Sequence, residues 1–320
     1  MRVPTFDDVL RAGKLLDDLL PPTPAWPYPV LAAATGAAEL WIKHENVQPI
    51  GAFKVRGGLT LLAGLTEPER ARGVLSYSTG NHAQSLAYAA RHFGAACTIV
   101  MPEGANPAKA AAVRALGAEL VLHGPSFEQA RAHAGELAAA RDARLVSAAD
   151  EPEIIAGVAT AYRELFEQAA GLDVVVVPVG SGTGAAAACL AAAELAPGCE
   201  VIGVQSSASP AGHDSWHAGE LVDRPNRTAV EGLATGSGFA LPQRILRQRL
   251  ADFVLVDDHA IAAAQWIMLR DAHTAAEGAG AAALAAVLGD HERFAGRRVA
   301  VVCTGANASE AELRRVLPAG

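Results

Sequence analysis

Short runs of apolar, mostly β-branched residues alternate along this chain with longer, alanine-rich runs. The short runs include residues 73–77, 97–101, 174–178 and 298–303, and small-residue turns with helix-forming segments follow the first three of them. Strands that alternate with helices in this way predict βαβ units, with parallel strands and right-handed crossovers. We therefore predict an α/β protein built on mainly parallel, twisted sheets flanked by helices.

The length of 320 residues exceeds that of a typical single domain and predicts two domains that share an interface. Hydrophobic residues make up 51% of the chain and charged residues 19%, which argues against a disordered chain. Leucines at near-helical spacing predict an opening helix across residues 6–20, ended by Pro21 and Pro22. Further strands are expected at residues 39–43, 119–122, 200–204 and 252–256.

The charge and the cysteines exclude several classes of function. A net charge of −8 argues against a nucleic-acid-binding protein, which would have a basic surface. The four cysteines are widely scattered, so they indicate neither a disulfide framework nor a zinc site and suit a reducing compartment. The N-terminus lacks the apolar core of a signal peptide, and no later apolar run reaches membrane-spanning length. We predict a cytoplasmic protein with no nucleic-acid or membrane partner.

Lys54 is the candidate for reactive chemistry. It lies between Phe53 and Val55 in a segment, residues 51–58, that has glycines on both sides of the lysine. Taken alone, such a lysine is most simply an ordinary residue on a helix face. In an apolar pocket, however, desolvation lowers the pKa of a lysine and makes its neutral amine available as a nucleophile and base. Lys54 is therefore a candidate for covalent catalysis on a carbonyl group.

A small-residue loop between an apolar strand and a helix is the candidate anion site. Its residues are Gly180, Ser181, Gly182, Thr183 and Gly184. Backbone N–H groups in such a loop converge on an anion at the positive end of the helix dipole. A dinucleotide-binding loop is an alternative, but it requires an acidic residue at the end of the next strand, where Gln205 stands. A plain structural turn is the second alternative.

Two further stretches carry polar groups at the ends of predicted strands. The first, residues 78–82, opens a helix with Ser78, Thr79, Gly80, Asn81 and His82. Free N–H groups there suit a bound carboxylate or a simple helix cap. Taken alone, His82 is better explained as a packed or helix-orienting residue than as a catalyst. Cys303 ends the last predicted strand, where a buried cysteine acting as a small hydrophobic residue is common.

Together, in this order and along nearly the whole chain, the segments around Lys54, Asn81, Gly180 and Cys303 resemble the fold-type II enzymes that use pyridoxal 5'-phosphate (PLP). The resemblance is to the serine/threonine dehydratase and serine racemase branch. It implies a tryptophan-synthase-β-like fold with a large PLP-binding domain, residues 1–48 plus 148–320, and a small domain, residues 49–147.

The resemblance also implies roles for the candidate residues. Lys54 would hold PLP covalently next to Phe53, and the loop at residues 180–184 would bind the phosphate. Asn81 would meet the phenolic oxygen of PLP, and residues 78–82, Asn81 included, would bind the substrate with its carboxylate. Cys303 would face the pyridine nitrogen; because a neutral thiol does not protonate the ring, elimination is favoured over transamination.

Five other positions qualify the resemblance. Thr79 stands where racemases of this branch have a serine that reprotonates the opposite face of the substrate. Glu231 and Glu277 lie in segments that resemble family segments near the cofactor, and a solvated glutamate is an equally good explanation for each. Relatives that bind Mg²⁺ or Ca²⁺ supply two carboxylates where Gln205 and Ala211 stand here, so we predict no divalent metal site.

The predicted function is that of a PLP-dependent ammonia-lyase acting on L-threonine and L-serine, with Lys54 as general base. The products would be 2-oxobutanoate or pyruvate and ammonia. Three alternatives stay open: a serine racemase, a dehydratase of a bulkier β-hydroxy amino acid such as hydroxyaspartate or one derived from hydroxyectoine, and a PLP- or dinucleotide-binding regulatory protein. The last is disfavoured because no DNA-binding element is evident. The resemblance further suggests a homodimer.

Overall fold

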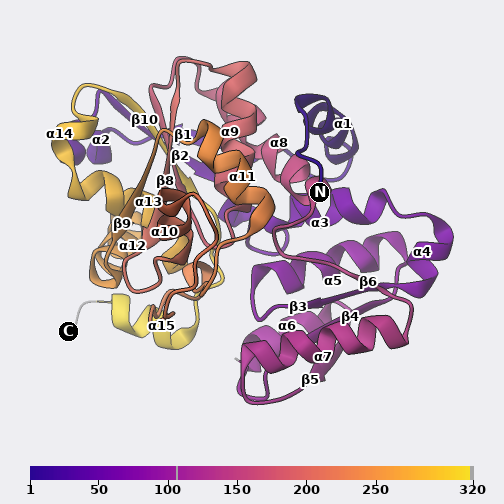
Figure 1. The fold of residues 1–320 in the computed structure, drawn as a ribbon. Helices are drawn as coiled ribbons and strands as arrows, with labels where there is room; N and C mark the ends of the chain where they lie inside the picture. Colours follow the sequence, from indigo (N-terminus) through magenta and orange to yellow (C-terminus); the bar gives the residue numbers. More distant parts are fainter. Residues whose placement is uncertain (106, 318–320) are drawn as a thin grey trace.

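Two separate β-sheets organise the computed structural model, which describes residues 1–105 and 107–317 (Figure 1). The larger sheet has six strands in the order β1-β2-β10-β7-β8-β9, and all neighbours are parallel except β1 and β2. The strands are β1 (Ala25–Pro27), β2 (Glu39–His44), β7 (Val174–Pro178), β8 (Glu200–Ser206), β9 (Asp252–Val256) and β10 (Arg298–Cys303). The four valines of β7 are fully buried, as expected for a parallel strand with helices on both faces.

The smaller sheet has four parallel strands in the order β5-β4-β3-β6. Its strands are β3 (Val74–Tyr77), β4 (Cys97–Met101), β5 (Glu119–Leu122) and β6 (Arg144–Leu145). Successive side chains of β3 and β4 point to opposite faces. Val74 and Ile99 pack on one side against α3 (Lys54–Ala63), α5 (Asn81–Phe93) and α6 (Pro107–Ala115), whereas Leu75 and Val100 pack on the other side against α7 (Phe127–Ala140).

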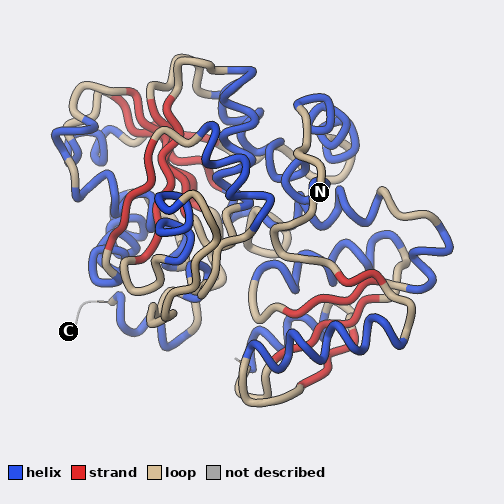
Figure 2. Tube along the Cα trace, in the orientation of Figure 1, coloured by secondary structure: helices blue, strands red, loops and turns tan. Residues whose placement is uncertain are grey.

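Helices cover both faces of the larger sheet (Figures 1 and 2). One face packs against α1 (Phe6–Leu16), α8 (Pro152–Gln168), α9 (Thr183–Leu195) and α11 (Ala240–Arg249). The other packs against α2 (Pro29–Thr35), α12 (Asp258–Asp271), α13 (Gly278–Gly289) and α14 (His291–Phe294). The remaining helices are α4 (Glu67–Arg72), α10 (Ala211–Ala218), α15 (Glu310–Val316) and the 3₁₀ turns η1 (Glu45–Val47) and η2 (Glu231–Leu233).

This architecture confirms the predicted α/β class and mainly parallel sheets. The opening helix is shorter than predicted: it ends at Leu16 rather than at residue 20, because the N–H groups of Leu19 and Leu20 both turn back to the Leu16 carbonyl. Strands β1 and β6 are not predicted from the sequence, since they have only three and two residues. The predicted domain bounds stay a prediction, although all four strands of the smaller sheet lie between residues 74 and 145.

None of the helices in the described part of the chain is both long enough and apolar enough to span a lipid bilayer.

Candidate active site

A cavity of about 190 Å³ lies where elements from the two sheets face each other. The larger-sheet side contributes the loop at residues 180–184 and the segment at residues 231–235, and the smaller-sheet side contributes residues 77–82 and Lys109. Lys54 and Phe53 also line it. The structure therefore brings the predicted lysine, glycine-rich loop and helix-opening segment to one place, although they are far apart in the sequence.

Lys54 is the first residue of α3, and its side chain is buried, with 9% of the residue exposed. Its Nζ donates to Thr183 Oγ1 at 2.8 Å, to the Ala148 carbonyl at 3.1 Å and to Ser181 Oγ at 3.3 Å. No carboxylate of the described residues forms an ion pair with it. Burial without a countercharge lowers the pKa of Lys54 to about 7, so a large fraction of the amine is neutral near neutral pH.

The loop at residues 180–184 joins β7 to the N-terminus of α9, a helix of 13 residues. Gly182 is the N-cap and has φ +89°, a left-handed conformation that favours glycine. A Cβ on Gly180 would lie 2.2 Å from the Gly232 carbonyl oxygen, so only glycine fits there without a shift of the backbone. The hydroxyls of Ser181 and Thr183 lie 2.9 Å apart. A phosphate suits this glycine-lined helix N-terminus, and a covalently attached aldehyde cofactor suits the amine beside it.

A methyl group at Gly180 tests the loop. We expect Gly180→Ala to weaken binding of the predicted cofactor, PLP, by about tenfold to a hundredfold, because forcing a Cβ against the Gly232 carbonyl costs about 1–3 kcal/mol. The measurement is the dissociation constant of PLP by equilibrium dialysis of the apoprotein. Gly198→Ala is the matched control, since a Cβ there meets no atom within 4 Å. Equal affinities for the two variants would contradict a close-packed loop.

Asn81, the first residue of α5, is held by two hydrogen bonds. Its Nδ2 donates to Glu277 Oε1 at 2.6 Å, and its Oδ1 accepts from Asn307 Nδ2 at 2.8 Å. One of the two N–H groups on Nδ2 therefore remains for a ligand. Glu277 is buried, lines the cavity, and has a pKa that burial raises to about 7. Ser78 Oγ, in the same cavity wall, accepts from the Gly80 N–H at 3.3 Å, and Thr79 lines the cavity too.

His82 is a packed histidine. Only 4% of the residue is exposed, and its Nε2 lies 3.1 Å from Ser76 Oγ. Burial, with a smaller effect of the Lys54 charge, lowers the pKa of His82 to about 3, so the ring is neutral at physiological pH. Its predicted part in substrate binding stays a prediction.

Thr304, rather than Cys303, is among the residues that line the cavity. Cys303 is the last residue of β10, is fully buried, and packs in the core beside α13, with Sγ 3.4 Å from where a Cβ on Gly280 would lie. Successive side chains at a strand end point to different sides. Of two neighbouring residues, one can therefore pack in the core while the next lines the cavity. Cys303 therefore lies outside the cavity lining that the structure describes, and its predicted place at the pyridine nitrogen stays a prediction.

Lys109 and Glu231 both line the cavity, and the sequence motifs do not predict that they pair. Lys109 lies in α6, which follows β4, and it forms an ion pair with Glu231 of η2. Parallel strands bring their carboxyl ends to one edge of a sheet, so the segment after β4 lies beside residues 78–82, which follow β3. The order of parallel strands could therefore have predicted that the segment with Lys109, which follows β4, contributes to the site.

Gln205, at the position of a metal-binding carboxylate in some relatives, has other partners. Its Oε1 accepts from the His213 N–H at 3.0 Å, and its Nε2 donates to Thr235 Oγ1 at 3.3 Å. Among residues 1–105 and 107–317, no three His, Cys, Asp or Glu side chains are grouped so as to hold a metal ion. The predicted absence of a divalent site stays a prediction.

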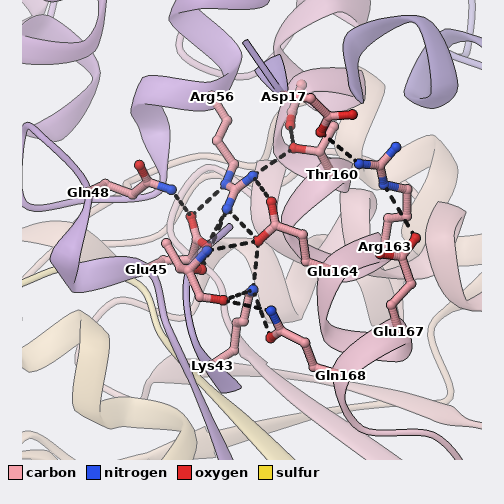
Figure 3. A network of polar contacts seen from close by, with 12 residues as sticks. Asp17, Lys43, Glu45, Gln48, Arg56, Thr160, Arg163, Glu164, Glu167 and Gln168 are labelled. Carbon is pink, nitrogen blue, oxygen red and sulfur yellow. Dashed lines mark hydrogen bonds and ion pairs between the residues drawn. The ribbon is translucent and has the colours of Figure 1, made fainter. Parts of the chain in front are cut away.

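A buried charge network supports the helix that carries Lys54 (Figure 3). Arg56 donates to both carboxylate oxygens of Glu45 and of Glu164, at 2.6–2.8 Å. Lys43 adds an ion pair with Glu164 at 2.7 Å. Two cations and two carboxylates, each at most 7% exposed, thus balance in charge and join α3 to α8 and to the end of β2.

The cavity combines a buried amine with a glycine-lined helix N-terminus beside it, an arrangement that suits an enzyme with a phosphorylated aldehyde cofactor. The family model described as "Pyridoxal-phosphate dependent enzyme" matches residues 16–305. The chain belongs to that family, its cofactor is PLP, and the residues around Lys54 and Gly180 fit the amine and phosphate sites that PLP requires.

Three similar proteins indicate which branch of this family the chain resembles. The chain is 32% identical over 308 residues to an L-threo-3-hydroxyaspartate ammonia-lyase of Saccharomyces cerevisiae, covering 96% of this chain and 94% of that protein. It is 35% identical over 317 residues to an L-threonine ammonia-lyase of Thermotoga maritima, covering 99% and 79%. The structure of maize serine racemase superposes with a TM-score of 0.93 at 25% identity, covering 98% and 97%. The predicted fold-type II branch and PLP cofactor are confirmed, and the homologues include carbon–nitrogen lyases.

Proposed function

We propose that the protein is a PLP-dependent ammonia-lyase that converts L-threonine or L-serine into 2-oxobutanoate or pyruvate and ammonia. The observation that carries the proposal is the buried Lys54 amine, which has a pKa of about 7 and lies 2.8 Å from Thr183 of the phosphate-binding loop. A general base is most effective when its pKa lies near the working pH. The amino-acid-converting relatives support the same reaction class.

Each cavity wall has a proposed task. Bound PLP supplies the electron sink that weakens the Cα–H bond of the substrate. The neutral amine of Lys54 takes up the Cα proton, and the N–H groups at the start of α5 hold the substrate carboxylate. Asn81, fixed by Glu277 and Asn307, directs its remaining N–H to the ring oxygen. The β-hydroxyl leaves as water, and addition of a water molecule to the resulting C=N bond then gives the 2-oxo acid and ammonia.

We propose Thr304 as the side chain at the pyridine nitrogen. Its place in the cavity lining supports this assignment over Cys303. Threonine and cysteine are both neutral at physiological pH, so the exchange leaves the mechanistic argument unchanged. Neither protonates the ring as a carboxylate would, and a weaker electron sink favours β-elimination over transamination.

The proposed reaction is tested by adding amino acids to the purified, PLP-loaded protein. We expect L-threonine and L-serine, but not the D-isomers, to change the visible absorption and to release 2-oxo acid. The measurement is the initial rate of oxo-acid formation with a lactate dehydrogenase coupling assay. A yellow protein that releases no oxo acid from either L-amino acid would contradict the proposal.

Serine racemase activity is the second candidate, because the Thr79 hydroxyl lines the cavity and the maize racemase has the same fold. Chiral chromatography of L-serine after incubation separates the two activities. D-serine without pyruvate would favour the racemase.

We also propose a cytoplasmic homodimer. Trp26, Val30 and Val47 expose 55–61% of their surface, and exposed large apolar side chains are a feature of subunit interfaces. Chromatography with light scattering measures the mass in solution, and a mass near 33 kDa would contradict the dimer.

A further inference from the structure

An ion pair crosses the cavity from one sheet's side to the other. Lys109 belongs to α6 of the smaller-sheet side, and Glu231 belongs to η2 of the larger-sheet side. Both side chains line the cavity. The Lys109 side chain is 10% exposed and the Glu231 side chain is 46% exposed, so the glutamate is the more solvent-accessible partner.

Lys109 is the one cationic side chain of the described cavity lining that the proposed reaction does not use. The other basic groups there are Lys54, which is committed to the cofactor, and His82, which is neutral. No arginine is among the lining residues that the structure describes. The acidic groups are Glu231 and the enclosed Glu277. A second carboxylate on a substrate therefore has Lys109 as its only cationic partner.

The Lys109 ammonium group is already paired with the Glu231 carboxylate. The substrate's α-carboxylate is proposed to lie at residues 78–82, so the carboxylate of a side chain would point elsewhere in the same cavity. If the side-chain carboxylate of the substrate approached Lys109, it would share one ammonium group with the Glu231 carboxylate. The two negative charges would then repel each other. If it did not, it would be desolvated without a countercharge. A neutral β-hydroxy side chain incurs neither cost.

We propose that the Lys109–Glu231 pair sets the substrate class, because Glu231 keeps Lys109 from binding a side-chain carboxylate and so selects neutral β-hydroxy amino acids over 3-hydroxyaspartate. This inference rests on the proposed ammonia-lyase function. Specificity here is a difference between two binding free energies, and a residue that repels the competitor is sufficient to create it. Three variants separate the effect of the Glu231 charge from that of the Lys109 charge. They are Glu231→Gln, Glu231→Asp and the double variant Glu231→Gln with Lys109→Met.

The first test compares kcat/KM for L-threo-3-hydroxyaspartate and L-serine. We expect the hydroxyaspartate-to-serine ratio to rise at least tenfold in Glu231→Gln, to stay near the wild-type value in Glu231→Asp, and to fall back in the double variant. An equal loss for both substrates in Glu231→Gln would indicate a purely structural ion pair and overturn the proposal. A wild-type preference for hydroxyaspartate over L-serine and L-threonine would also overturn it.

The second test is binding without turnover. Succinate has the four-carbon dicarboxylate skeleton and no amino group, so its dissociation constant from the PLP-loaded protein can be measured by isothermal titration calorimetry. We expect Glu231→Gln to bind succinate at least tenfold more tightly than wild type, and the exposed control Glu220→Gln to match wild type. Unchanged affinity would overturn the inference. If no amino acid is turned over but the succinate affinities differ as expected, the proposed function fails while the charge selection stands.

Discussion

Replacing Lys54 with alanine should abolish turnover and remove the visible absorption of bound cofactor. The Lys54 amine is the proposed covalent attachment point and the proposed base, and it donates to Thr183 of the loop at residues 180–184. Proton transfer by a placed base contributes about a hundredfold to ten-thousandfold, and the variant also loses the proposed attachment point, so we expect kcat to fall by at least about a hundredfold. The measurements are the absorption spectrum after dialysis against PLP and the rate of oxo-acid release.

The control is Lys14→Ala, which removes an exposed lysine of α1 and should change neither quantity. Turnover retained in Lys54→Ala would refute the proposed mechanism. The apoprotein offers a further check that does not depend on activity. Because burial lowers the pKa of Lys54 to about 7 from 10.5, the unfolded chain binds the proton more tightly between these values. Wild-type stability should therefore gain a rising contribution across pH 7 to 10.5 that the alanine variant lacks.

The parts of the site that lie in one contiguous stretch can be predicted from the sequence. Lys54 and the loop at residues 180–184 each follow a strand or turn, and their residue types limit the chemistry. Contacts between distant stretches carry no such local signal. Asn81 meets Glu277 across 196 residues and Asn307 across 226, and Lys109 meets Glu231 across 122. Only the folded topology brings these side chains together.

The sequence also does not show that Cys303 packs in the core while Thr304 lines the cavity, and the reason is different. In a half-exposed strand, alternation of polar and apolar residues tells which side chains face the core. Strand β10 is buried on both faces, with five of its six residues buried, so its sequence has no alternation to read. The side to which Cys303, the last residue of β10, points is therefore determined by packing against α13, where it lies beside Gly280. The strands β1 and β6 leave no recognisable pattern because they have only three and two residues.

Replacing Arg56 with methionine should destabilise the folded protein by about 3–5 kcal/mol, the usual cost of leaving buried partner charges unpaired. The guanidinium is 1% exposed and holds the carboxylates of Glu45 and Glu164, which would lose four hydrogen bonds (Figure 3). Lys43 alone would then face two buried carboxylates. Urea denaturation of the apoprotein measures the effect. The control is Arg314→Met, which breaks an exposed ion pair with Glu310 and should cost less than about 1 kcal/mol.

The pH dependence of this loss identifies its electrostatic origin. In the wild type, Arg56 offsets burial and holds the pKa of Glu45 below its ordinary value of 4.5, so Glu45 stays ionised in the folded state. Without Arg56, burial favours the protonated form, and the folded variant binds a proton more readily than the unfolded chain does. The variant should therefore regain stability as the pH falls from 7 towards 5, and the gap to the wild type should narrow. A gap below about 1 kcal/mol at pH 7, or one that does not change with pH, would mean that the network does not support α3 through its charges.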